Sequence, residues 1–296
     1  MSGVLIHIGF PKAGSTYLQT WFEKHPAFLY RPKAIAGFYD AHGLARYAQK
    51  TEKLHEYFVL SSEDLSVWKG DFNVVGFEGK AYNVQQYHLN LTATLQSIFP
   101  TAKVLIITRG YSSMLLSLYS QYIKGGGTLT FKELQQHYGQ YFGLLYDYNW
   151  IIEQYRKTYG ADKVIVMPYE LFKTDPVKFT NLLEEKLDIQ EKFSLGNEKI
   201  NPSMSGEMIT ALRRFSKFLY KAVKPLPNNL QQKIYGWHTR QLIYNDHYPL
   251  VEWLAKRVKQ PEPMQVEEGI LKLFAGKADI LRHEELFTPY LKEYLI

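Results

Sequence analysis

Short apolar runs and amphipathic stretches alternate over the first two thirds of the chain. Apolar runs of strand length, typical of a buried parallel sheet, lie at 4–8, 57–60, 103–108 and 164–167. Between and after them, apolar positions recur at helical spacing, over 85–99, 112–124, 131–138, 145–159 and 176–187. Strands that alternate with helices predict an α/β fold with a central, mainly parallel sheet and helices on both faces.

The pattern changes near residue 205. From there, helical spacing continues without strong strands at 205–223, 231–259, 267–274 and 284–295. We expect residues 1–204 to form the core and residues 205–296 to form a helical extension packed on it, within one structural domain.

Three further segments of the core are less regular. A polar helix over 42–55 is predicted between the first and second clear strands, and a strand over 73–78 between the second and third. Glycines 125–127 predict a flexible break, which is either the hinge of a loop over a site or a simple linker.

Composition is that of an ordinary globular protein, with 46% hydrophobic and 22% charged residues. The chain has no cysteine, which excludes disulfides and zinc-thiolate sites. No window approaches the roughly 20 apolar residues of a membrane span, and nothing before the first apolar run has the form of a signal peptide. We therefore expect a cytoplasmic protein without a transmembrane segment.

A net charge of +6 favours anionic ligands: a nucleotide, an acidic glycan or, by peripheral contact, a membrane surface. Nucleic acid is not expected, because no basic run or known binding motif accompanies the charge.

The first apolar run leads into a glycine-rich loop. Gly9 and Gly14 bracket it, and a helical pattern begins at Ser15. Successive N–H groups of such a loop and of the helix's first turn form a cradle for a phosphate-like anion. The spacing nearly matches the nucleotide-triphosphate signature G-x-x-x-x-G-K-[ST], but Ser15 stands where that signature has lysine, and Lys12 lies inside the loop. A buried strand, a glycine turn and a core helix would give a similar pattern.

Charged residues stand just past the ends of three predicted strands: Lys12, Glu63 and Arg109. Because ligands of parallel sheets bind beyond the carboxyl ends of the strands, these three side chains are predicted to converge.

Two motifs resemble those of the sulfotransferases that use 3′-phosphoadenosine 5′-phosphosulfate (PAPS). The segment Pro11-Lys12-Ala13-Gly14-Ser15-Thr16 is similar to that family's 5′-phosphosulfate loop, P-K-[ASTG]-G-[ST]-[ST]. Arg109 and Ser117, eight residues apart behind the strand 103–108, resemble its 3′-phosphate site, and Ser113 lies one helical turn before Ser117 on the same face. Taken singly, an arginine after a strand or a helical serine is commonly a solvated surface residue. Their co-occurrence in the family's order carries the resemblance, which covers roughly residues 4–205.

The resemblance implies transfer of a sulfuryl group from PAPS to an acceptor hydroxyl or amine, which leaves adenosine 3′,5′-bisphosphate (PAP) and needs no metal. Lys12 would neutralise charge on the oxygen between phosphate and sulfur, assisted by the loop amides of Ala13 to Thr16. Glu63, in a Ser-Ser-Glu segment like that of bacterial members, is the expected general base. Glu63 fits a second role equally well, because a carboxylate at the start of a helix interacts favourably with the helix dipole. Glu78 and His7 are weaker candidates.

Asn201 and Ser203 resemble an N-x-S segment near the cofactor in bacterial members, although a turn before the next helix explains them equally well. The animal cytosolic segment R-K-G-x-x-G-x-W is missing, as are the anchor and cysteines of Golgi enzymes. The resemblance therefore implies a bacterial enzyme whose acceptor is a glycan, a glycolipid or a small metabolite.

Two other functions compete with this one. A P-loop nucleotide kinase would need the missing lysine after Gly14 and a strand-end aspartate for magnesium. A non-catalytic protein that binds PAPS or PAP would have no use for Lys12.

Overall fold

The computed structural model describes residues 3–10, 12–30, 55–66, 83–195, 204–244 and 249–296. The strand predicted over 73–78 lies outside these residues, as does the helix predicted over 42–55 except for its last residue.

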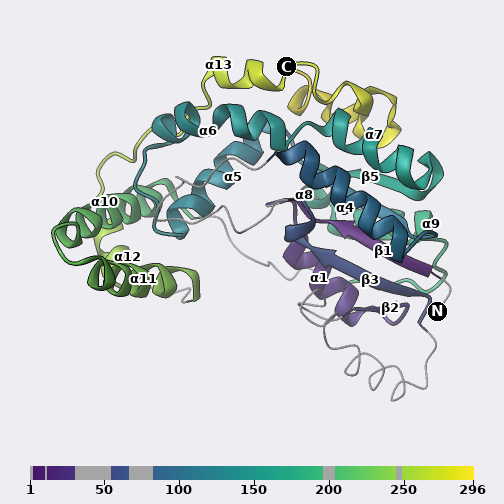
Figure 1. The fold of residues 1–296 in the computed structure, drawn as a ribbon, viewed down its shortest axis with the longest axis horizontal. Helices are drawn as coiled ribbons and strands as arrows, with labels where there is room; N and C mark the ends of the chain where they lie inside the picture. The colour runs from purple at the N-terminus through teal and green to yellow at the C-terminus, as the bar shows by residue number, and fades with distance from the viewer. Residues whose placement is uncertain (1–2, 11, 31–54, 67–82, 196–203, 245–248) are drawn as a thin grey trace.

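Five parallel strands form the central sheet, in the order β2-β3-β1-β4-β5 (Figure 1). They are β1 Gly3–Ile8, β2 Phe28–Leu29, β3 Tyr57–Ser62, β4 Lys103–Thr108 and β5 Val164–Pro168. Ile8 pairs with Ser62 of β3 and with Ile106 of β4, so the carboxyl ends of these strands lie at one edge. The prediction of an α/β fold around a parallel sheet is confirmed.

Helices cover both faces of the sheet. Helix α4 (Val84–Ile98) and helix α7 (Tyr148–Tyr159) pack on each other over one face, whereas α1 (Ser15–Lys24) lies on the other (Figure 1). The connection through α1 runs from β1 outwards to β2, and that through α4 runs from β3 across to β4. Right-handed crossovers in opposite directions place their helices on opposite faces.

Between β4 and β5, two of the described helices begin or end at residues other than those predicted. Helix α5 is Tyr111–Lys124, close to prediction, but α6 is Phe131–Leu145 and does not end before Gly139 as predicted. A Cβ on Gly139 would lie 2.8 Å from Ile270 Cδ1. The glycine therefore serves close packing against the C-terminal segment rather than helix termination, and α7 begins at Tyr148 instead of residue 145.

The predicted flexible break at 125–127 is wrong, because these glycines form a buried, hydrogen-bonded turn. Gly127 N–H donates to the Tyr122 carbonyl at 2.9 Å, and the Tyr235 hydroxyl donates to the Gly126 carbonyl at 2.5 Å. A Cβ on Gly127 would lie 2.2 Å from the Tyr122 ring. Gly127 is needed because the Tyr122 ring lies against it, and Gly126 because of its φ of +89° and the Thr239 methyl group 2.7 Å from a Cβ there.

The C-terminal third contains three longer helices and several short ones. Helix α10 is Gly206–Val223, capped by Ser205, and α11 (Asn228–Tyr244) and α12 (Pro249–Ala255) replace the single helix predicted over 231–259. The short helices of this third are α13 Glu268–Leu271 and the 3-10 segments η4 Lys272–Phe274, η5 Asp279–His283 and η6 Glu285–Glu293. The core has short helices too, which are α8 Tyr169–Thr174 and the 3-10 segments η1 Glu63–Leu65 and η3 Ala161–Lys163. Helix α9 is Pro176–Leu187, as predicted.

These C-terminal elements pack on the core along its helices and on β5. Helices α10 and α11 pack on α5, α13 and η4 on α6, η5 on α7, and η6 on β5 and α5. Of the helices that the structure describes, none is both long and apolar enough to cross a membrane.

Candidate functional site

The loop after β1 is shaped by two residues in the left-handed conformation. Lys12 has φ +68° and Gly14, the N-cap residue of α1, has φ +83°. Gly14 offers no side-chain cap, and the first N–H groups of a helix have no acceptor inside it. Left-handed positions in a loop turn successive N–H groups toward one side, the geometry of an anion-binding nest. This backbone therefore fits a phosphate-like group.

The predicted residues of this loop differ in their exposure. Ala13 and Ser15 are buried, Gly14 is half-buried and Thr16 is exposed in the first turn of α1. A Cβ on Gly9 would lie 2.8 Å from Ser15 Oγ, which accounts for the first glycine. Pro11 lies outside the described residues.

The Lys12 side chain lies beside α5. Its Nζ donates to Gln121 Oε1 at 3.5 Å, a long contact. Burial lowers the pKa of the Lys12 ammonium, the negative charge of Glu63 opposes that shift, and the positive charges of Arg109 and Lys124 add to it. Lys12 is thus within electrostatic reach of Glu63 and Arg109, the two residues predicted to converge on it.

Arg109 joins the two predicted anion sites. Its NH1 donates to the Lys12 carbonyl at 2.5 Å, across 97 positions of sequence, and its Nε donates to Ser113 Oγ at 3.0 Å. The guanidinium lies 4.4 Å from the centre of the Tyr169 ring, a cation–π arrangement. Of the five N–H donors of a guanidinium, these two have acceptors among the described residues, so others remain for an anion.

The turn that carries Arg109 is held by side chains from distant parts of the chain. Gly110 N–H donates to Glu170 Oε1 at 2.8 Å, and the Tyr294 hydroxyl donates to Glu170 Oε2 at 2.5 Å. Tyr148 completes the support, because its hydroxyl accepts from Arg109 N–H at 3.2 Å and donates to the Arg109 carbonyl at 2.8 Å. Burial raises the pKa of the Tyr294 hydroxyl well above its usual range, so it remains a donor.

One face of α5 presents polar groups at intervals of one turn: Ser113, Ser117 and Gln121. Ser113 accepts from Arg109 and donates to the Gly110 carbonyl at 3.1 Å. Ser117 is half-buried between Ser113 and the residue that contacts Lys12. The polar face of α5 therefore contacts Arg109 at one end, through Ser113, and Lys12 at the other, through Gln121.

Glu63 begins the short segment η1, directly after β3, and is half-buried. Ser66 ties this segment to the loop after β1, because its hydroxyl donates to the Gly9 carbonyl at 2.9 Å. Both interpretations of Glu63, as a base and as a helix-start carboxylate, fit this position.

His7 is a core residue. It is fully buried in β1, its Nδ1 lies 2.8 Å from Ser61 Oγ, and burial lowers its pKa to about 3. Glu78, Asn201 and Ser203 lie outside the described residues.

The sequence patterns missed several residues around this site: Gln121, Tyr169, Glu170, Tyr148 and Tyr294. Gln121 could have been found, since it continues the four-residue spacing of Ser113 and Ser117. Glu170 follows β5 directly and its place at a strand end is a weak signal. No local pattern marks Tyr294, 186 positions from its partner Thr108.

Comparison with known proteins gives structural matches only. No protein-family model matches the chain, and no match is found among curated proteins. The fold matches the crystal structure of a sulfotransferase from Alicyclobacillus acidocaldarius, with 17% identity and a TM-score of 0.49 over 78% of this chain and 99% of that one. It also matches mouse sulfotransferase SULT7A1 complexed with PAP, with 16% identity and a TM-score of 0.40 over 100% of this chain and 90% of that one. Both solved proteins are sulfotransferases, the class that the motifs at 11–16 and 109–117 resemble.

Proposed function

We propose that this protein transfers a sulfuryl group from PAPS to an acceptor hydroxyl or amine. The observation that carries the proposal is the 2.5 Å hydrogen bond from Arg109 NH1 to the Lys12 carbonyl. It brings together the two predicted anion sites, which are far apart in sequence. In order and residue type, they resemble the sulfotransferase sites for the 5′-phosphosulfate and the 3′-phosphate of PAPS.

The residues present fit such a donor. At one end, the left-handed loop at 12–14 and the first turn of α1 offer N–H groups for a phosphosulfate. At the other, Arg109, Ser113 and Ser117 offer a guanidinium and two hydroxyls for the 3′-phosphate. When bound, PAPS would supply an activated sulfuryl group.

Lys12 would stabilise the charge that develops as the sulfuryl group leaves. Burial already penalises its ammonium, as the lowered pKa records. A poorly hydrated cation attracts a nearby anion more strongly than a solvated one does, because less water has to be displaced. The loop N–H groups from Ala13 to Thr16 would act on the same anion, and their backbone is in place before any ligand arrives.

Glu63 is our proposed general base. It lies at the edge where β1 and β3 end, within electrostatic reach of Lys12. A carboxylate there would accept the acceptor's proton close to where the sulfuryl group leaves the donor. We propose that the acceptor is a hydroxyl compound of the glycan, glycolipid or small-metabolite class.

A ligand-binding experiment separates this function from a nucleotide kinase. Thermal shift is measured with PAP, with adenosine 5′-phosphosulfate, which lacks the 3′-phosphate, and with ATP plus magnesium. We expect PAP to stabilise the protein without metal. A larger shift with ATP and magnesium would contradict the proposal.

The role of Arg109 is tested by Arg109→Ala. We expect it to weaken PAP at least about tenfold, because a charge-assisted hydrogen bond contributes about 1.5–3 kcal/mol. The affinity for adenosine 5′-phosphosulfate should fall less, because that nucleotide loses only the support that Arg109 gives to the Lys12 carbonyl. Arg282→Ala is the control, since the exposed Arg282 side chain pairs with its exposed neighbour Asp279. Equal losses for both nucleotides would remove Arg109 from the 3′-phosphate site.

Catalysis is tested by incubating the protein with sulfur-labelled PAPS and a panel of glycans, lipids and small hydroxyl compounds. Transfer of label to any acceptor, or slow release of sulfate without one, distinguishes an enzyme from a PAP-binding protein. Tight PAP binding with neither activity would favour the non-catalytic alternative.

A further inference from the structure

The positive charge of this protein is concentrated in one part of the chain. Residues 205–260 contain ten Lys and Arg against three Asp and Glu, a net +7. The whole chain carries +6, so the remaining residues, with 25 cations and 26 acids, carry −1. Helices α10, α11 and α12, here called the α10–α12 lobe, are built from this segment. They are grouped at one end of the molecule, away from the central sheet (Figure 1).

Large exposed apolar side chains are concentrated on the same lobe. Among the described residues, seven of the twelve lie on it: Phe218, Tyr220, Leu230, Ile234, Trp237, Leu250 and Trp253. Phe218 is 69% exposed, and each of the two tryptophans is more than half exposed. Single exposed apolar residues are ordinary, but a concentration of this kind marks an interaction surface.

Apolar and basic residues are interleaved along α10 and α11, and basic residues follow the apolar ones directly after α12. In α11, Leu230, Ile234 and Trp237 share one exposed stripe at helical spacing, and Lys233 and Arg240 flank it. This stripe is separate from the face that α11 buries in the lobe, which carries Tyr235, His238 and Leu242.

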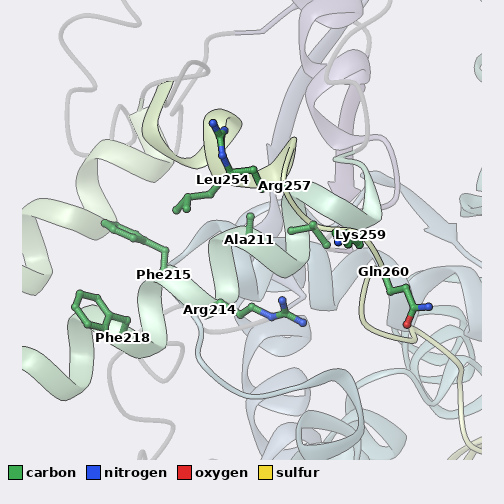
Figure 2. A pocket seen from close by; sticks show the side chains of 9 residues that line it. Ala211, Arg214, Phe215, Phe218, Leu254, Arg257, Lys259 and Gln260 are labelled. Carbon is green, nitrogen blue, oxygen red and sulfur yellow. The ribbon is translucent and has the colours of Figure 1, made fainter.

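Helices α10 and α12 show the same arrangement on either side of an open groove. On α10, Phe218 lies one turn from Arg214 and from Lys221. Just after α12, the Arg257 guanidinium lies 3.5 Å from the centre of the exposed Trp253 ring. Figure 2 shows Phe218 and Phe215 on one side of the groove and Leu254 and Arg257 on the other. The groove has a volume of about 810 Å³.

We propose that the α10–α12 lobe docks on the surface of an anionic phospholipid bilayer. Helices that lie in a membrane interface combine Lys and Arg, which attract anionic headgroups, with Trp, Phe and Leu, which enter the boundary of the acyl chains. The lobe carries both kinds of residue on exposed faces, and its charge is opposite to that of the membrane.

Two other occupants fit less well. A second copy of this chain would bring like positive charges together, since a two-fold contact uses the same patch twice. An acidic glycan would satisfy the cations and stack on the aromatic rings, but it offers nothing to bury the aliphatic side chains of Leu230, Ile234 and Leu250. The bilayer proposal does not depend on sulfuryl transfer.

The experiment is flotation with vesicles of neutral phosphatidylcholine alone or mixed with anionic phosphatidylglycerol. We expect binding to the anionic vesicles, with loss in high salt, because charge attraction to the surface is screened within a Debye length. Binding equal on both vesicle types, or absent from both, would overturn the proposal.

Variants locate the contact. The triple change Phe218→Ser, Trp237→Ser and Trp253→Ser, and separately Lys221→Glu with Lys233→Glu, should each reduce vesicle partitioning at least about tenfold. The matched controls are Leu89→Ser with Ile98→Ser and Leu144→Ser for the apolar set, and Lys157→Glu with Lys178→Glu for the charges, all exposed and outside the lobe. These controls should retain binding. PAP-induced thermal shift, measured on every variant, shows that the fold and the nucleotide site are intact.

Three outcomes would contradict the proposal. Binding that survives the lobe variants would place the contact elsewhere. Retention on an immobilised acidic polysaccharide without vesicle binding would identify a glycan surface. A dimer in light scattering that is lost in the triple variant, again without vesicle binding, would identify a second copy.

Discussion

The two halves of the candidate site are built in different ways. The loop after β1 owes its conformation mainly to its own residues, with left-handed conformations at Lys12 and Gly14 and the start of α1 immediately behind. Ser66 and Arg109 contact its Gly9 and Lys12 carbonyls from distant segments. The turn after β4 is short, and its shape depends on Tyr148, Glu170 and Tyr294, which lie 39, 60 and 186 positions from their partners in the turn or in β4. One half is encoded locally, and the other is assembled by the fold.

Mutations in the two halves should therefore affect ligand binding and stability differently. A change in the β1 loop acts on the backbone that meets the ligand. A change in the supports of the β4 turn acts first on packing and only then on Arg109. Binding and stability measured together on the same variants therefore distinguish the two halves.

The largest effect is expected from Lys12→Ala. Loss of one stabilising cation at the reacting group should lower turnover of PAPS by about 10²–10³-fold. The melting temperature should stay nearly unchanged, because the one hydrogen bond of this side chain to a described residue is the long 3.5 Å contact with Gln121. Turnover is followed by release of labelled sulfate. Undiminished turnover would exclude Lys12 from the reaction and leave the β1 loop with a binding role alone.

The next effect concerns pH and the strand that carries the β1 loop. Folding lowers the pKa of His7 from 6.5 to about 3, so below 6.5 the unfolded chain binds a proton that the folded chain does not. Stability is complete above 6.5 and falls as the pH decreases toward 3. Between about pH 7 and about pH 5, His7 should account for a loss of about 2 kcal/mol. In urea unfolding, the free energy of unfolding of His7→Gln should therefore fall by about 2 kcal/mol less over this pH range than that of the original protein. An unchanged pH dependence would contradict this role of His7.

A smaller effect tests the supports of the β4 turn. Tyr294→Phe removes the hydroxyl that donates to Glu170 at 2.5 Å and accepts from Thr108 at 3.2 Å. It should lower the free energy of unfolding by about 1–2 kcal/mol and weaken PAP several-fold.

Tyr155→Phe is the matched control, because the buried Tyr155 hydroxyl has no hydrogen-bond partner among the residues that the structure describes. Its removal should be neutral or slightly stabilising. If both variants lost the same stability, the hydrogen bonds of Tyr294 would not support the turn.

The smallest effect compares two glycines. At Gly14, with φ +83°, alanine should destabilise by about 1–2 kcal/mol because a Cβ is strained in the left-handed region. At Gly236, inside α11, a Cβ meets nothing within 4 Å, and alanine should stabilise by up to about 1 kcal/mol. Thermal unfolding of the two variants should show opposite signs. The same sign in both would mean that the β1 loop does not depend on its left-handed glycine.

Patterns of local spacing account for much of the fold. The strand 103–108 and the helix 176–187 have the predicted bounds, because continuous apolar runs and a proline-started amphipathic stretch depend on nearby residues alone. Glycines led to wrong predictions of a helix end and of a flexible break, because at these positions they serve tertiary packing. Gly139 lies inside α6 and glycines 125–127 form a fixed turn, since what decides these positions is Ile270, Tyr122 and Tyr235 packed against them.

By itself, the sequence determined the parallel sheet, the glycine-rich loop after β1 and the placement of Lys12, Glu63 and Arg109 at strand ends. These depend on spacing within a few residues, or on the rule that parallel strands end at one edge. Only the tertiary structure decided that Arg109 reaches the Lys12 carbonyl and that Glu170 and Tyr294 hold its turn. It also decided that Phe218, Trp237 and Trp253 are exposed on one lobe together with basic side chains such as Lys221 and Lys233. Such contacts depend on which distant segments the fold places side by side, and no local period records that choice.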